Sequence, residues 1–269
     1  MPNNSTQGNE ELCIRISRND LSFATYGQPT KSHPSYVQYP IRNGIAMAAN
    51  LRNAFKDTEM LTQEYRQVTA LIDSPVVMVP VQEFNEEESN TLYHYTITGM
   101  EGNQVIHQPL ENLNTVAVFC INKDLRLVLD EHFNDIRYLP LPLPVWNYLY
   151  NHSFNGIRKK LYVFFHDKRM EVFSFDKTRF KFCNSFDTEH AQDAVYYILY
   201  VWQQLGYNAQ HDEIYLTGTI PETRWMTEAL QHYVQKTNIL ETPNDIHLAP
   251  FTHLGEMPFD LQVLFAQNK

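Results

Sequence analysis

Two β-hairpin patterns, separated by a constant 149 positions, constrain the fold of this 269-residue chain more than any other feature. In residues 12–26 and again in 161–175, apolar residues alternate on both sides of a short polar turn, at 17–20 and 166–169. Such alternation is typical of a hairpin with a buried face. The matching positions are Leu12, Ile14, Ile16, Leu21 and Phe23 with Leu161, Val163, Phe165, Met170 and Val172 (161 − 12 = 149; 172 − 23 = 149). The sequence therefore predicts one structural plan used twice.

The elements expected after each hairpin follow the same order. A third strand comes first, then a helix, and then a near-continuous apolar strand of the kind found in buried parallel sheets. These are expected at 36–39, 45–61 and 68–72 in the first half, and at 180–183, 188–205 and 214–217 in the second. The first half continues with a helix from about residue 84, a buried strand at 116–121 and a helix at 123–133. The second half continues with a helix at 222–234.

The helix expected at 188–205 has an unusual apolar pattern. One face carries Ala, Val, Ile, Leu and Trp, and the opposite face carries Tyr196, Tyr197 and Tyr200. A helix that is apolar nearly all round usually lies between two layers. We therefore expect it to be wedged near the interface between the two halves.

The whole chain resembles the actin and hexokinase superfamily, whose members contain two copies of this plan. Residues 137–150 look like the strand and helix that pass between the two domains there. The chain from Leu12 to about Phe265 also resembles an uncharacterised Bacteroidetes family with the actin-like ATPase fold, through 12–16, 21–23, 193–197 and 216–218. The resemblance implies a duplicated actin-like (RNase H-like) α/β fold, with two lobes that each hold a mixed sheet flanked by helices. It also implies a first lobe at 12–140, a crossover helix and linker at 141–160 and a second lobe at 161–269. The polar residues 1–11 are expected to be a disordered leader.

Active members of the superfamily bind the phosphates of ATP at the two hairpin turns, through Asp-x-Gly motifs. Glycine is needed because a Cβ would block the approach of backbone N–H groups to phosphate. Neither turn of this chain contains glycine, although Asp20 and Asp167 lie in them. Thr217, Gly218 and Thr219 stand where the family has its adenosine motif, with one glycine of two. These five residues are the candidate site, an altered nucleotide cleft.

The other patterns in the sequence favour no metal or catalytic site. The eleven histidines form neither His-x-His nor His-Glu-x-x-His, and His166-Asp167 is expected to be a solvated turn. The sequence has no Gly-x-Ser-x-Gly, and the strand at 12–16 has no carboxylate of the kind that a two-metal nuclease needs.

Composition narrows the environment and the partners. A net charge of −10 argues against nucleic acid as the main ligand. The three cysteines are far apart, as is typical of free thiols in a reducing compartment. The N-terminus is polar, and no run approaches the ~20 apolar residues of a membrane helix, so we expect a cytoplasmic protein without membrane insertion.

Two functions remain open from the sequence. The favoured one is a non-catalytic scaffold or partner-binding protein without a cofactor, its protein partner unknown, by analogy with pilus-assembly relatives of actin that bind peptides. The alternative is an atypical switch or weak ATPase that binds ATP or ADP with Mg²⁺. Residues Asp20, Asp167 and Gly218 around one cavity would favour the alternative, and a cleft packed with Phe and Tyr rings would oppose it.

Overall fold

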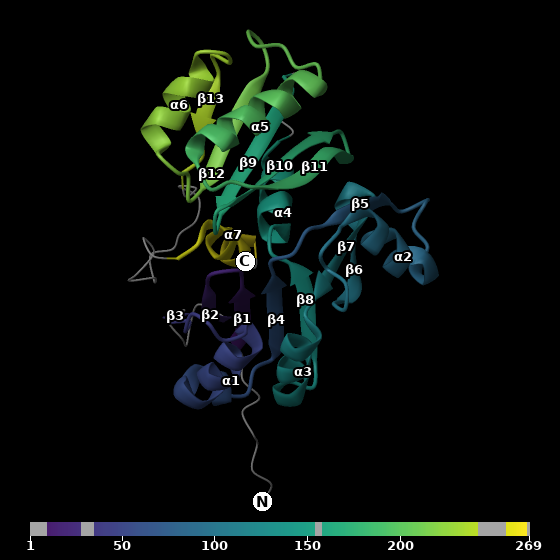
Figure 1. The fold of residues 1–269 in the computed structure, drawn as a ribbon, viewed down its shortest axis with the longest axis vertical. Helices are drawn as coiled ribbons and strands as arrows, with labels where there is room; N and C mark the ends of the chain where they lie inside the picture. Colours follow the sequence, from purple (N-terminus) through teal and green to yellow (C-terminus); the bar gives the residue numbers. More distant parts are fainter. Residues whose placement is uncertain (1–9, 28–34, 154–157, 242–256, 268–269) are drawn as a thin grey trace, which may run out of the picture.

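The computed structural model describes residues 10–27, 35–153, 158–241 and 257–267. It contains two five-stranded mixed sheets, one in each half of the chain, with helices against both (Figure 1). The duplicated α/β fold expected from the sequence is confirmed. Most of the expected leader, residues 1–9, lies outside the described residues, and its last two residues open the first strand.

The sheet of the first lobe has the order β3-β2-β1-β4-β8. Its strands are β1 (Glu10–Ile16), β2 (Leu21–Gly27), β3 (Ser35–Tyr39), β4 (Gln67–Ile72) and β8 (Ile136–Pro140). β1 pairs antiparallel with β2 and parallel with β4, so the first hairpin and the parallel strand are confirmed. Leu12, Ile14 and Ile16 of β1 pack with α1 (Met47–Asp57) and α3 (Lys123–His132). Because side chains alternate along a strand, Cys13 and Arg15 share the opposite face.

A second, smaller sheet is inserted in the first lobe. It has the order β5-β7-β6 and is antiparallel throughout, from β5 (Val77–Pro80), β6 (Gln104–Leu110) and β7 (Thr115–Ile121). The helix α2 (Glu86–Thr96) packs on it through Tyr93. The strand expected at 116–121 therefore exists, but it is the middle strand of this sheet, and β8 takes the fifth place in the main one. Two 3₁₀ turns, η1 (Glu59–Thr62) and η2 (Glu111–Leu113), complete the lobe.

The sheet of the second lobe repeats the first, with the order β11-β10-β9-β12-β13. Its strands are β9 (Lys160–His166), β10 (Arg169–Asp176), β11 (Arg179–Asp187), β12 (Glu213–Gly218) and β13 (Thr237–Ile239). Ile16 pairs with Leu21 in the first hairpin, and Phe165 pairs with Met170 in the second. The strand register thus confirms the separation of 149 positions.

The prediction for the helix in residues 188–205 is wrong in its location. α5 (Ala191–Gln204) packs with α6 (Thr223–Gln231) against one face of the second sheet, and its other side faces solvent. Tyr196 is 64% exposed and Tyr200 is 50% exposed. Tyrosine tolerates this because its ring carries a polar hydroxyl, and the two rings stack with centroids 6.3 Å apart.

Two helices lie between the lobes (Figure 1). They are α4 (Leu143–His152), expected as the crossover helix, and α7 (Phe259–Gln267), which the sequence reading missed. They contact each other and join a core shared by both sheets, which includes Cys13, the fully buried Trp146 and Phe164. Among the described residues, no helix has the length and apolar character that crossing a bilayer requires.

Candidate functional site

The two hairpin turns approach each other between the lobes, where the sequence placed the candidate site. In the first turn, the Ser17 N–H donates to the Asp20 carbonyl at 2.9 Å. In the second turn, Asp167 and Lys168 have φ values of +46° and +60°. Consecutive left-handed residues define the tight hairpin turn that usually carries Asn-Gly or Asp-Gly. The second turn therefore has a backbone conformation that favours glycine, although it contains none.

One arginine side chain, that of Arg15, bridges both turns. The Arg15 Nη1 donates to Asp20 Oδ2 at 2.9 Å, and its Nη2 donates to Asp167 Oδ2 at 3.1 Å. Its Nε contacts both carboxylate oxygens of Asp260 on α7, at 3.1 and 2.9 Å. The side chains of Arg15 and Asp260 are 3% and 0% exposed. A single buried guanidinium thus joins the first lobe, the second lobe and the helix between them.

The charges in this cluster influence one another. Burial would lower the pKa of Arg15, but Asp260, Asp167 and Asp20 raise it, so the guanidinium stays charged. Burial would also raise the pKa of Asp167, but His166 and Arg15 hold it well below its ordinary value. For Asp260, burial outweighs the attraction of Arg15, and its pKa is raised.

A second arginine makes a parallel connection beside the first. Arg169 Nη1 donates to Asp73 Oδ1, beyond the end of β4, at 3.0 Å, and its Nε donates to Asp187 Oδ1 at 3.2 Å. Arg18 of the first turn reaches the same Asp187 oxygen at 3.3 Å. The Arg169–Asp73 pair is buried and joins the lobes, whereas the Arg18–Asp187 pair is largely exposed and contributes little.

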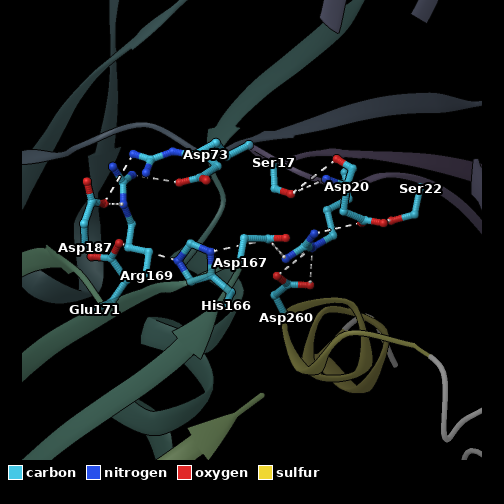
Figure 2. A network of polar contacts seen from close by, with 12 residues as sticks. Ser17, Asp20, Ser22, Asp73, His166, Asp167, Arg169, Glu171, Asp187 and Asp260 are labelled. Atoms are coloured by element: carbon cyan, nitrogen blue, oxygen red, sulfur yellow. Dashed lines mark hydrogen bonds and ion pairs between the residues drawn. The ribbon is translucent and has the colours of Figure 1, made fainter. Parts of the chain in front are cut away.

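His166 lies between these two arginine clusters, with a relative exposure of 4% (Figure 2). Its ring nitrogens are 3.7 Å from Asp167 Oδ2 and 3.6 Å from Glu171 Oε1, and neither makes a hydrogen bond. Burial would lower the pKa of His166, but polar contact with Asp167 and Glu171 and the charge of Asp73 raise it to about 9. His166 is therefore protonated at neutral pH. The expectation of a solvated turn is wrong for His166, because its side chain is buried.

Four of the five candidate residues line one cavity of about 660 Å³ between the lobes: Asp20, Asp167, Gly218 and Thr219. Thr217 is fully buried outside that lining, and its hydroxyl donates to the Leu240 carbonyl at 3.1 Å. The rings of Phe164 and Phe259 also line the cavity. The cavity therefore shows both the feature expected to favour a nucleotide-binding switch and the aromatic packing expected to oppose it. That the five residues form a nucleotide cleft stays a prediction.

Close packing accounts for the glycine at position 218. Its φ is +84°, and a Cβ built there would lie 2.1 Å from the Phe165 carbonyl oxygen. That oxygen also accepts a hydrogen bond from the Thr219 N–H at 2.9 Å. Gly218 therefore allows β12 to turn sharply beside β9, and this packing explains the glycine without a ligand.

The most connected residues of the site, Arg15 and Asp260, were missed by the sequence reading. Arg15 carried a signal, since it is a lone charge inside an otherwise apolar strand. Asp260 carried none, because its partner is 245 positions away. Within the described ranges, no three His, Cys, Asp or Glu side chains are arranged to hold a metal ion.

Two sheets of matching topology, joined by crossing helices and meeting at paired hairpin turns, place the protein in the class with the actin-like ATPase fold. The chain belongs to the family described as "Protein of unknown function (DUF3822)", whose model matches residues 2–237. No curated protein matches the sequence.

Two solved structures support this placement. A Bacteroides thetaiotaomicron VPI-5482 protein, described as having an actin-like ATPase fold and unknown function, is similar with 26% identity and a TM-score of 0.85 over 98% of both chains. The PilM-PilN type IV pilus biogenesis complex is similar at 12% identity, with a TM-score of 0.51 over 86% of this chain and 88% of the other. The second likeness shows the fold alone.

Proposed function

We propose that this protein is a non-catalytic member of the actin-like fold class that serves as a scaffold or binds a protein partner. Its lobes are joined by ion pairs where ATPases of the fold hold a nucleotide between them. The observation that carries the proposal is the buried Arg15 side chain, held by Asp20, Asp167 and Asp260 between the two hairpin turns.

The charge of the turns supports this reading. Phosphate binding needs free backbone N–H groups or unpaired cations. Among the described residues that line the cavity, the positive groups are Arg15 and His166, and both already contact carboxylates. A triphosphate placed there would face aspartates, and the cations that could bind its phosphates are already paired with carboxylates. Displacing Arg15 would leave buried carboxylates without a partner, which typically costs about 3–5 kcal/mol.

The alternative is a nucleotide-dependent switch or weak ATPase. It is favoured by one observation, that Asp20, Asp167, Gly218 and Thr219 line a single cavity. In that case Mg²⁺ would have to compete with Arg15 for the aspartates.

Two further observations support a partner-binding role in the cytoplasm. The similar PilM structure is described in complex with another protein, PilN, so the fold is compatible with a protein partner. Cys13, Cys120 and Cys183 are free, as is usual in reducing compartments.

Thermal unfolding with and without 5 mM ATP or ADP and Mg²⁺ tests the proposal. A ligand at a hundredfold excess over its Kd stabilises the native state by about 2.7 kcal/mol. We expect no Mg²⁺-dependent rise in Tm. A clear rise that disappears in Asp167→Ala would favour the alternative instead.

A further inference from the structure

The cavity between the lobes has the size of a binding site. Its volume of about 660 Å³ lies within the range of ordinary ligand pockets. Its walls come from β3, the β9–β10 turn, the segment after β12, the end of β13 and the start of α7. Elements from both lobes thus face one space, and an occupant would contact both.

The charges of the lining favour a positively charged occupant. Four carboxylates line the described part of the wall, against the guanidinium of Arg15 and the imidazolium of His166. The carboxylates are Asp20, Asp167, Glu241 and Asp260. Glu241 is exposed and makes no ion pair with another described residue. The carboxylates of this wall therefore outnumber its positive groups by two.

The lining also includes apolar residues, among them Ile220, Ile239, Leu240, Met257 and Phe259, beside polar ones such as Gln38, Thr219, Thr223 and Gln262. An apolar wall beside an acidic one suits the side chains of lysine and arginine, which bury their methylene stems and keep the charged head near polar groups.

The buried imidazole is a second and independent sign of an occupant. His166 lines the cavity, is 4% exposed, and neither ring nitrogen makes a hydrogen bond within the described chain. Buried polar atoms without partners are uncommon and call for an explanation such as a ligand. The acceptors nearest to its ring nitrogens, Asp167 Oδ2 and Glu171 Oε1, lie 3.7 and 3.6 Å away, beyond hydrogen-bond distance, so a closer acceptor such as a peptide carbonyl would complete the hydrogen bonding of the protonated ring.

We propose that this cavity binds a lysine or arginine side chain from an extended segment of a partner protein. The head group contacts Glu241, the described lining carboxylate that Arg15 does not hold, the stem packs on Ile239 and Ile220, and a carbonyl of the segment reaches the side of His166. This proposal rests on the partner-binding function and names the chemistry that the partner presents.

Selection from a phage-displayed library of random dodecapeptides on the intact chain tests this proposal. We expect enriched peptides to contain lysine or arginine, and their affinity to fall when that residue is replaced by glutamine. Glu241→Gln should weaken binding roughly fivefold, the upper range for one partly exposed charge pair. Ile239→Lys, which adds a cation to the wall at a 39% exposed position, should weaken it more. The matched control is Glu87→Gln on α2, an exposed carboxylate outside the cavity lining, which should change nothing.

Three results would overturn the proposal: no enrichment, enriched peptides without basic residues, or affinities that neither cavity variant changes. The same binding and unfolding measurements with 5 mM MgATP distinguish failure of this proposal from failure of the proposed function. If MgATP alone raises the Tm of the chain, the proposed non-catalytic function without a nucleotide is contradicted, whichever peptides are selected. Basic peptides that MgATP does not displace agree with both proposals.

Discussion

Replacing Arg15 by methionine gives the most direct test of how the lobes are held together. The change keeps much of the side-chain volume but removes four hydrogen bonds and the cation that Asp20, Asp167 and Asp260 share. Removing one partner of a buried ion pair typically costs about 3–5 kcal/mol, and we expect a loss of that size at pH 7. Urea denaturation followed by tryptophan fluorescence measures it, with the free energy of unfolding extrapolated to water.

The pH dependence and a control make this test specific. The depressed pKa of Asp167 stabilises the native state above the ordinary carboxylate range, and this contribution is lost as the pH falls through the folded pKa. The difference between wild type and Arg15→Met should therefore shrink in acid. Arg224→Met, at a 93% exposed side chain paired with Glu228, should cost less than about 0.5 kcal/mol. A loss below about 1 kcal/mol for Arg15→Met would refute the idea that Arg15 holds the lobes.

Three further changes test other parts of the site. Gly218→Ala should destabilise the native state by more than about 3 kcal/mol, since its Cβ would overlap the Phe165 oxygen. The control Gly206→Ala, with φ +63° and open space around the added Cβ, should cost about 1 kcal/mol. Equal urea midpoints for the two variants would contradict this prediction. Lys168→Gly should stabilise by about 0.5–1 kcal/mol by relieving a φ of +60°, and a lower Tm would instead reveal a favourable side-chain role. The raised pKa of His166 stabilises the native state fully below about pH 6.5, and this stability is lost as the pH rises through about 9, so wild type should weaken between pH 7 and 9.5. His166→Gln should be flatter over that range, and an unchanged slope would rule out His166 as its source.

The strands were predictable because their signal is local. Alternating apolar residues report burial of one face directly, so both hairpins and their separation could be read from the sequence. The assignment of strands to sheets was not predictable in the same way. The apolar run at 116–121 suits a buried strand in either sheet of the first lobe. Its place in the small sheet depends on pairing with β5 and β6, which the apolar pattern does not encode.

The candidate site was predictable in position and not in its partners. The hairpin turns identified Asp20 and Asp167, and the structure does bring both to one cavity. Their common partner could not be foreseen, because the contacts of Arg15 with Asp167 and Asp260 span 152 and 245 positions. The prediction that α5 lies between the lobes failed for a different reason. Its tyrosines were counted as apolar, whereas the tyrosine hydroxyl lets the ring remain in contact with water.

The separation of 149 positions has a consequence for how copies of this chain can associate. By that correspondence Asp167 is the counterpart of Arg18, and Arg169 is the counterpart of Asp20. Suppose that the first lobes of two copies packed against each other in the way that the two lobes of one chain do. Arg15 of one copy would then face Arg18 of the other, and Asp73 would face Asp20. Like charges would then replace both buried pairs between the lobes. The two halves share one architecture but have opposite charges at these two pairs of equivalent positions, so like charges would disfavour the packing of two first lobes in this arrangement.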